Sequence, residues 1–324
     1  MTRPLAGIVG LGASGPVAQD PRSIPEMVLT AVEDAIGDAG IGFADIDAVV
    51  SASVDLYDGL TASNIAITEV VGAVMKPETR IAGDGLAALA HAACLVWAGA
   101  YDTVLVVAHG KASMAPQDLL SEWVMDPVLL QPLGASFMVC SGLQAQLLAT
   151  EGAERRWARR AAELRGCDIT DVLDSPISAA PLRALMKAPD ADAAFAVVLR
   201  ANQPGVTVKS VGFDLDAHAP GDRDLRSWPG LRRAFKRAGG HGNGAFDVVA
   251  DSCRFPHEEE LFRTATGLAP TGGLFAGAAP VAAGLGQLVA ATRALRAAPG
   301  RALAHGTWGP AGQAHAVAVL ERAA

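Results

Sequence analysis

The sequence of 324 residues predicts an α/β protein whose two halves repeat one pattern. Two observations lead to this prediction: apolar strand-like runs alternate with helical patterns, and one helix-strand unit occurs twice at similar spacing. With 51% hydrophobic and 19% charged residues, the chain can bury a large core. We therefore expect a pseudo-twofold α/β/α/β/α sandwich, in which two duplicated halves pack face to face.

The elements of the first half follow from apolar runs and helix-ending glycines. Strands are expected at residues 8–12 and 48–53, and helices at residues 25–39 and 86–98. The helices are followed by Gly40 and Gly99, and glycine is typical just past the end of a helix. The order strand, helix, strand predicts parallel neighbours joined by right-handed crossovers.

The second half repeats this order. Gly85-Leu86 opens a helix that leads to a strand ending in Ala108-His109-Gly110, and Gly284-Leu285 opens one that leads to Ala304-His305-Gly306. Further strands are expected at residues 248–250, 302–305 and 314–320, and a helix at residues 285–296. This internal similarity predicts a duplicated fold.

The segment Arg80-Ile81-Ala82-Gly83-Asp84-Gly85 and the Ala-rich helix after it resemble the nucleophile segment of the thiolase superfamily. In that family a Cys-x-x-Gly turn leads into a buried helix, and Ala82 stands where the cysteine would be. A cysteine at a helix N-terminus gains thiolate character, and covalent acyl transfer depends on such a nucleophile. The resemblance implies that Ala82, at the start of the buried helix, leaves nothing to acylate.

Other segments carry the same resemblance. Residues 171–183 and 192–199 are similar to the middle of sterol-carrier-protein-type thiolases, and residues 305–313 to the loop of the second catalytic cysteine, but without a cysteine. Residues 246–255 resemble the segment that ends in E-x-H-D-x-F, which puts Ser252 at a catalytic histidine. Residues 270–280 resemble the segment that leads to Gly-His-Pro, with Ala279 at its histidine. The resemblance therefore implies a degenerate active site.

The resemblance also implies the domain organisation. We expect a thiolase-like five-layer sandwich with an N-terminal half at residues 1–205 and a C-terminal half at residues 206–324. A loop domain at about residues 111–189 would cover the acyl-CoA pocket. Coenzyme A thioester is the expected ligand, with no other cofactor and no metal.

The candidate catalytic residues are Asp84, Asp251, Ser252 and His305. Asp84 precedes the helix that follows Ala82, but aspartate there is also an ordinary helix cap. Asp251 and Ser252 follow a strand, where polar residues perform chemistry or simply form turns. His305 and His109 occupy equivalent strand ends, which duplication alone also explains.

The cysteine content and the net charge indicate in which compartment the chain works and which ligands it is not expected to bind. Its four cysteines form no Cys-x-x-Cys pair, which argues against zinc sites and disulfides and for a reducing, cytoplasmic compartment. Cys140 lies in a nucleophile-like motif, Cys-Ser-Gly-Leu-Gln-Ala, but lacks a preceding strand, so we expect it to be a packed cysteine. A net charge of −8 argues against nucleic acid, and no window reaches the roughly 18 apolar residues of a membrane span.

Two functions follow from these expectations. The first is a non-catalytic or co-catalytic subunit of a thiolase- or ketosynthase-type acyltransferase complex. The alternative is a C–C bond lyase (retro-aldolase), or an acyltransferase of altered mechanism, acting on acyl-CoA. Such lyases in the family use tyrosines, and Tyr57 and Tyr101 both lie outside matching segments, which favours the first function.

The resemblance further implies association. We expect a homodimer, a heterodimer with an active thiolase homologue, or a complex with a small zinc/OB-fold partner. The Val- and Leu-rich strand at residues 103–108 is expected at the edge of the sheet, where a partner would cover it.

Overall fold

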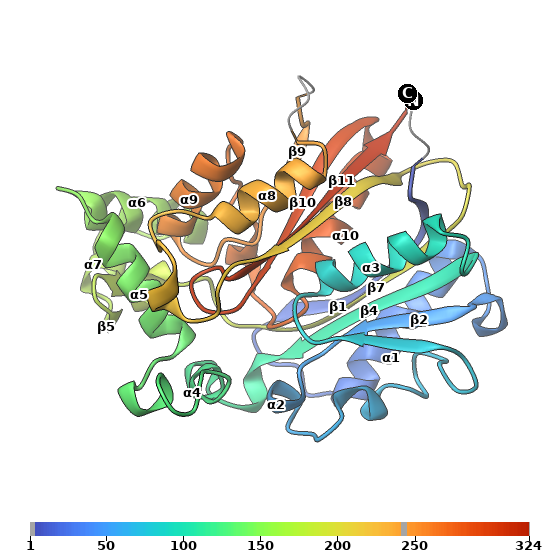
Figure 1. Ribbon diagram of the computed structural model, residues 1–324, viewed down its shortest axis with the longest axis horizontal. Helices are drawn as coiled ribbons and strands as arrows, with labels where there is room; N and C mark the ends of the chain where they lie inside the picture. The colour runs from blue at the N-terminus through green and yellow to red at the C-terminus, as the bar shows by residue number, and fades with distance from the viewer. Residues whose placement is uncertain (1–3, 241–244, 324) are drawn as a thin grey trace.

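One nine-stranded sheet runs through both halves of the computed structural model, which describes residues 4–240 and 245–323 (Figure 1). The strand order is β3-β2-β4-β7-β1-β8-β11-β10-β9. The strands are β1 (Ala6–Val17), β2 (Ala48–Ala52), β3 (Glu78–Ile81), β4 (Thr103–Lys111), β7 (Asp192–Arg200), β8 (Thr207–Leu215), β9 (Val248–Ala250), β10 (Gly300–Trp308) and β11 (Ala314–Arg322). Two residue pairs, Ala6 with Val208 and Gly7 with Thr207, join the halves between β1 and β8.

The helices turn this sheet into five layers. Helices α3 (Gly85–Trp97) and α10 (Ala283–Ala297) lie between the two halves of the sheet (Figure 1). Helix α1 (Ile24–Ala39) covers the outer face of the N-terminal half, and α8 (Pro229–Arg237) with α9 (Pro256–Thr266) covers that of the C-terminal half. The predicted α/β/α/β/α sandwich is therefore confirmed.

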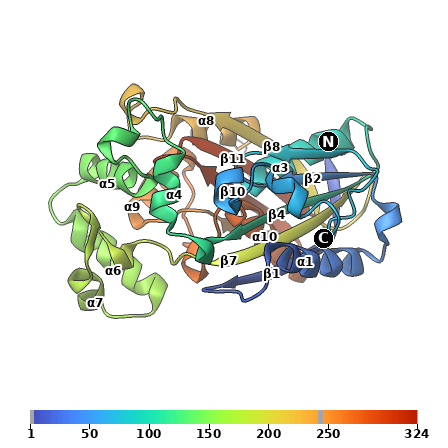
Figure 2. The same cartoon turned by 90° about the horizontal axis from the view of Figure 1, so that it is seen from below.

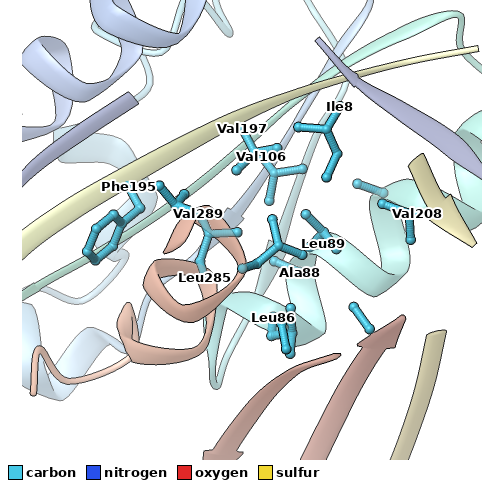
Figure 3. Close-up of a cluster of buried hydrophobic side chains, with 14 of the residues drawn as sticks. Ile8, Leu86, Ala88, Leu89, Val106, Phe195, Val197, Val208, Leu285 and Val289 are labelled. Carbon is cyan, nitrogen blue, oxygen red and sulfur yellow. The ribbon is translucent and has the colours of Figure 1, made fainter. Parts of the chain in front are cut away.

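The central core explains why α3 is apolar nearly all round and why α10 is apolar on the face that meets it. Leu86 and Leu89 of α3 pack with Leu285 of α10, and side chains from both halves of the sheet, such as Val106 and Val208, close over them (Figure 3). A helix buried on all sides needs apolar residues on every face. The repeated Gly-Leu helix starts of the sequence mark these two central helices.

Local signals set the bounds of α1 as the sequence predicts. Ser23 and Glu26 form a capping box at its start, and Gly40 ends it with φ 64°. The helix lies close to β1, because a Cβ on Gly12 would come within 1.7 Å of the Ala31 carbonyl oxygen. The early glycines of the chain thus serve helix packing.

The structure corrects one prediction about the edge of the sheet. Residues 103–108 belong to β4, which lies between β2 and β7, and the edge strands of the described sheet are β3 and β9. Strand β4 is buried over nearly its whole length. A continuous Val- and Leu-rich run is typical of an interior strand covered on both faces, so this pattern marked the centre of the sheet.

A mainly helical segment separates β4 from β7. It contains α4 (Gln117–Trp123), α5 (Phe137–Leu148), α6 (Ala153–Arg165), α7 (Ile169–Asp174) and the short strands β5 (Ile177–Ala179) and β6 (Leu182–Arg183). These helices gather at the end of the molecule away from the chain termini (Figures 1 and 2). The exact domain boundaries proposed from the sequence stay a prediction.

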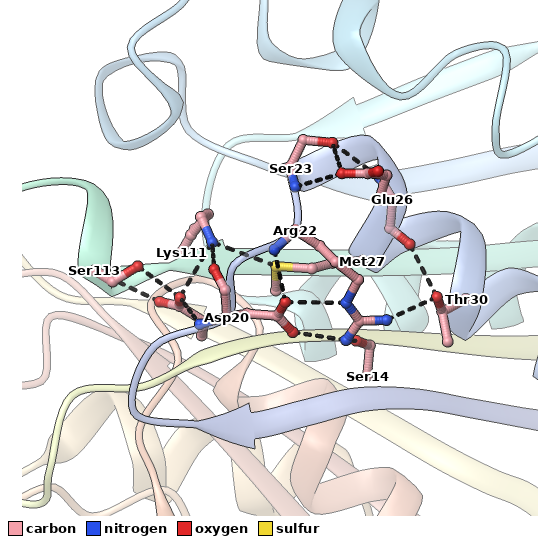
Figure 4. A network of polar contacts seen from close by, with 10 residues as sticks. Ser14, Asp20, Arg22, Ser23, Glu26, Met27, Thr30, Lys111 and Ser113 are labelled. Carbon is pink, nitrogen blue, oxygen red and sulfur yellow. Dashed lines mark hydrogen bonds and ion pairs between the residues drawn. The ribbon is translucent and has the colours of Figure 1, made fainter.

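A polar network ties the two ends of this segment together (Figure 4). Asp192 accepts hydrogen bonds from the Ser113 N–H at 2.9 Å, the Ser113 hydroxyl at 2.6 Å and the Asp20 N–H at 2.8 Å, and Lys111 lies 3.3 Å away. Burial raises the pKa of Asp192, but these hydrogen bonds outweigh it and the pKa is lowered. Asp20 in turn pairs with Arg22 at 2.6 Å.

None of the helices that the structure describes is both long enough and apolar enough to cross a membrane.

Candidate active-site cleft

A narrow cleft opens where the helical segment after β4 meets the ends of β10 and α9. Its walls include Tyr57, Phe137, Lys187, Arg254, Glu258 and Trp308, and we call this opening the cleft. Its volume is about 50 Å³, which in this conformation accommodates the reacting atoms of a ligand and not a whole cofactor.

Glu258 is the buried acid of the cleft. It lies in the first turn of α9, is 5% exposed, and its Oε2 accepts a hydrogen bond of 2.6 Å from the Arg254 N–H. Burial raises the pKa of Glu258 to about 7, while that hydrogen bond and the Arg254 charge act in the opposite direction. A carboxyl group with this pKa can take up or release a proton near neutral pH.

Tyr57 provides a neutral hydroxyl in the same cleft. It belongs to the short helix α2 (Asp55–Asp58), and its ring meets Trp308 edge to face at a centroid distance of 5.4 Å. Phe137 contacts the same indole at 5.9 Å. Burial raises the pKa of Tyr57 to about 12, so the phenol stays protonated and can donate a hydrogen bond to a developing anion.

Two cations complete the cleft. Lys187 pairs with Asp190 at 2.7 Å, whereas Arg254 forms no salt bridge with any carboxylate among residues 4–240 and 245–323. An Arg254 guanidinium without a carboxylate partner gives the cleft a positive charge for an anionic or polarised oxygen. The cleft therefore combines a base, a neutral donor and a cation.

Asp84, by contrast, connects the two central helices. Its Oδ1 accepts from the Leu86 N–H at 2.9 Å and its Oδ2 from the Gly284 N–H at 3.0 Å, so one carboxylate caps both α3 and α10. Burial raises the pKa of Asp84 to about 6, against the effect of both hydrogen bonds. A Cβ on Gly284 would lie 2.0 Å from Oδ1, and a Cβ on Gly306 would lie 2.1 Å from it. Glycine at both positions therefore leaves the space that the Asp84 carboxylate occupies.

Asp251, Ser252 and His305 lie in the core under α8 and α9 and do not line the cleft. Asp251 accepts N–H bonds from Cys253 at 3.1 Å, Thr271 at 2.6 Å and Gly272 at 3.0 Å. Each of the three predicted residues is at most 1% exposed. Their catalytic roles, like that of Asp84, stay predictions, and the geometry gives Asp251 a structural role in holding a loop.

A buried chain of hydrogen-bonding side chains connects Ser252 to two histidines. The Ser252 hydroxyl lies 3.4 Å from His305 Nδ1, and His305 Nε2 lies 3.1 Å from His315 Nδ1. Burial lowers the pKa of His305 to about 3, reinforced by His315, and burial likewise lowers that of His315 to about 3. Both rings are therefore neutral at physiological pH, and neither lines the cleft.

The positions matched to the family's catalytic residues do not converge. Helix α3 begins at Gly85, within one residue of the predicted start. Ala82 therefore lies before the helix, two residues ahead of the cap Asp84, and is exposed instead of lying at the buried N-terminus expected for it. Ala279 is buried and faces a third opening beside Phe195. Ser252 lies in the core described above.

Ala82 and Asp84 line a separate opening, which we call the apolar pocket. Its lining includes Ala82, Asp84, Ala87, Phe213, Leu215 and Trp308, and its volume is about 300 Å³.

The cysteines offer no activated thiol in the cleft. Cys140 is buried in α5 against Met125 and Leu225, as expected from the sequence, and burial raises its pKa to about 11. Burial also raises the pKa of the Cys253 thiol well above its usual range. Among the residues that the structure describes, no three or more His, Cys, Asp or Glu side chains are grouped to hold a metal ion.

Sequence reasoning missed Glu258, Arg254 and Lys187, and it discounted Tyr57. Glu258 to Glu260 resemble a solvated helix start, since acids are common in the first turn of a helix. Glu258 and Glu259 are nevertheless buried, and Glu259 pairs with Arg160 at 2.8 Å. The available signal is that this helix begins a few residues after the strand that precedes Asp251 and Ser252.

No protein-family model matches the chain, and no curated protein is similar to it by sequence. Solved structures are similar to it. An aldolase described as Ltp2-ChsH2(DUF35) aligns with a TM-score of 0.73 and 18% identity over 99% of both chains. The acetyl-CoA acetyltransferase of Bacillus anthracis aligns with 0.79 and 12% identity, over 98% of this chain and 99% of that one.

Human mitochondrial 3-ketoacyl-CoA thiolase, solved in complex with CoA, aligns with a TM-score of 0.78 and 15% identity, over 99% of this chain and 98% of that one. The similarity extends over the whole length of both chains while few residues are identical. The chain therefore has a thiolase-like fold.

Proposed function

We propose that this chain is a lyase that cleaves a C–C bond in a β-hydroxyacyl-CoA thioester by a retro-aldol reaction. The observation that carries the proposal is Glu258, a buried carboxyl group with a pKa of about 7 in a cleft with Tyr57 and Arg254. An acyl-enzyme route would need an activated nucleophile, and the cysteines Cys140 and Cys253 are buried with raised pKa values.

The proposed step balances with these groups alone. The Glu258 carboxylate removes the proton of the β-hydroxyl group, and the O–H electrons form the new carbonyl as the bond between Cα and Cβ breaks. The electrons of that bond pass to the thioester oxygen as an enolate, which the Tyr57 hydroxyl and the Arg254 charge stabilise. Glu258, now protonated, then returns this proton to Cα, which yields an aldehyde or ketone and a shorter acyl-CoA.

The location of Tyr57 favours the lyase over the non-catalytic role that the sequence favours. Tyr57 was discounted because it lies outside the segments that resemble thiolases, yet it shares the cleft with Glu258. One of the similar structures is named an aldolase. We therefore take cleavage of an acyl-CoA as the function that the geometry supports best.

The Glu258→Gln variant tests this function. Wild-type protein is expected to convert 3-hydroxyoctanoyl-CoA to acetyl-CoA and hexanal, detected by liquid chromatography and mass spectrometry. Glutamine cannot act as the base, so kcat is expected to fall about 10²- to 10⁴-fold. Glu163→Gln, on the exposed face of α6, is the matched control and is expected to retain full activity. Equal rates for both variants would rule out Glu258 as the base.

A co-catalytic subunit is the second candidate function. It is favoured by the scatter of Ala82, Ser252 and Ala279 over three separate places. In this role the edge strand β3, which ends just before Ala82, would pair with a second copy, an active homologue or a small zinc/OB-fold protein.

Arg80→Pro tests association through β3. Proline removes a backbone N–H from an edge strand, so the variant is expected to sediment as a monomer where the wild type is a dimer. Arg80→Ala is the control, because it also removes the side chain that pairs with Asp55 but keeps the N–H. If proline and alanine variants sediment alike, β3 is not the interface.

A further inference from the structure

The apolar pocket and the cleft share one wall. The Trp308 side chain lines both openings, and the rings of Tyr57 and Phe137 meet it from the cleft. Trp308 is the lining residue that the two openings have in common, so the cleft and the apolar pocket are neighbours.

The wall of the apolar pocket is chemically uniform. Ten of its twelve lining residues are apolar or glycine, and the exceptions are Asp84 and Gln313. The Asp84 oxygens accept the N–H groups of Leu86 and Gly284, and the Gln313 amide donates to the Asp216 carbonyl oxygen at 3.3 Å. Both polar side chains of the pocket are therefore already hydrogen-bonded, and an apolar ligand would break none of these bonds.

Small side chains create the space and exposed apolar ones surround its mouth. Ala82, Gly83 and Ala87 leave the volume open on the α3 side, and Gly306 cannot carry a larger side chain beside Asp84. Phe213 and Leu215 of β8 are 41% and 54% exposed at the rim. Exposed apolar residues around an apolar hollow are typical of a ligand groove.

The volume is large enough for a hydrocarbon group. A cavity of about 150 Å³ lined by Leu, Ile and Phe binds benzene, and the apolar pocket has about 300 Å³.

We infer that the apolar pocket binds the hydrocarbon part of the substrate, a chain or ring of six or more carbons. The inference rests on the proposed function for the location of the thioester, which would lie across Trp308 in the cleft. It makes the protein selective for medium-length or ring-bearing acyl groups over short ones.

Binding of straight-chain alkan-1-ols tests the inference without any CoA. Dissociation constants of 1-butanol, 1-hexanol and 1-octanol are measured by ligand-observed NMR. Each added methylene is expected to tighten binding about fourfold until the pocket is filled. The fill-in variants Ala87→Leu and Gly83→Leu are expected to weaken 1-octanol binding at least tenfold.

The substituted positions leave room for a larger side chain. A Cβ on Gly83 would have Trp308 as its nearest neighbour, at 3.9 Å, so a side chain there projects into open space. Ala98→Leu, on the exposed residue just past the end of α3, is the matched control and is expected to bind 1-octanol like the wild type.

Two outcomes would overturn the inference: equal affinity for all three alcohols, or fill-in variants that bind 1-octanol like the wild type. If instead the fill-in variants dissociate a dimer without changing alcohol binding, a second copy of the chain fills the pocket and the inference is likewise overturned. Loss of the proposed lyase activity is a separate result, because Glu258→Gln is expected to bind 1-octanol with unchanged affinity.

Discussion

Two buried acids near helix N-termini have different surroundings in this protein. Asp84 and Glu258 are 4% and 5% exposed, and burial raises the pKa of both. Asp84 accepts N–H bonds from two different helices, whereas the backbone partners of Glu258, Arg254 and Phe255, belong to the turn just before its own helix, and its side chain lines the cleft. Burial and a raised pKa alone therefore do not identify a catalytic acid; what distinguishes the two is that Asp84 connects two helices while Glu258 faces the cleft.

The largest difference between the two acids is expected in stability, from the Asp84→Ala variant. The substitution leaves the Leu86 and Gly284 N–H groups without an acceptor in a buried place, and each unsatisfied donor costs about 1–3 kcal/mol. We expect the free energy of unfolding to fall by about 2–4 kcal/mol in chemical denaturation. Glu258→Gln keeps an oxygen at the same position and is expected to change it by under about 1 kcal/mol.

Similar losses of stability in Asp84→Ala and Glu258→Gln would mean that both acids are structural. The proposed assignment of Glu258 would then lose its support.

The pH dependence of stability is the second way to separate Asp84 from Glu258. The folded pKa of Asp84 is about 6, above the ordinary value near 3.9 in the unfolded chain. The native state therefore binds this proton more tightly, and its contribution to stability is complete below about pH 4 and lost as the pH rises through 6. Across this range the contribution is on the order of 3 kcal/mol, at about 1.4 kcal/mol per pKa unit.

The Asp84→Asn variant isolates this contribution. Between pH 4 and 6.5, the wild type is expected to lose stability relative to Asp84→Asn, measured by urea denaturation at each pH. Asparagine does not titrate, so the difference between the two curves reports Asp84 while other acids cancel. A difference that is constant with pH would show that Asp84 titrates normally.

The smallest effect is expected in how the rate of the proposed reaction depends on pH. If Glu258 is the base, its ionised form is active, so kcat/KM is expected to fall about tenfold per pH unit below its pKa of about 7. A rate profile measured from pH 5 to 9 checks this. A flat profile, or a fall centred near pH 4, would indicate that another group accepts the proton.

The elements and their caps were predictable from the sequence, because the signals that encode them are local. The capping box at Ser23 and the glycine at Gly40 set the bounds of α1 within a residue of those predicted. The repeated Gly-Leu starts identified α3 and α10 as equivalent helices. Asp84 was predicted either as a cap or as a catalytic acid, and the structure shows the cap.

The composition of the cleft was not predictable in this way. Tyr57, Lys187, Arg254 and Trp308 come from segments far apart in the chain, and their proximity depends on how the halves and the helical segment pack. The interior position of β4 likewise depends on β2 and β7, which pair with it from both sides.

The two central helices, most of the long strands and the duplication follow from the sequence alone. Hydrophobic periodicity and helix caps involve only a few neighbouring residues, so a short stretch of sequence contains these signals. Which charged residues are buried depends on how distant segments pack together. Glu258 resembles a surface acid until the cleft residues pack around it, because the pKa of a side chain depends on desolvation by whatever lies nearby, however distant in sequence.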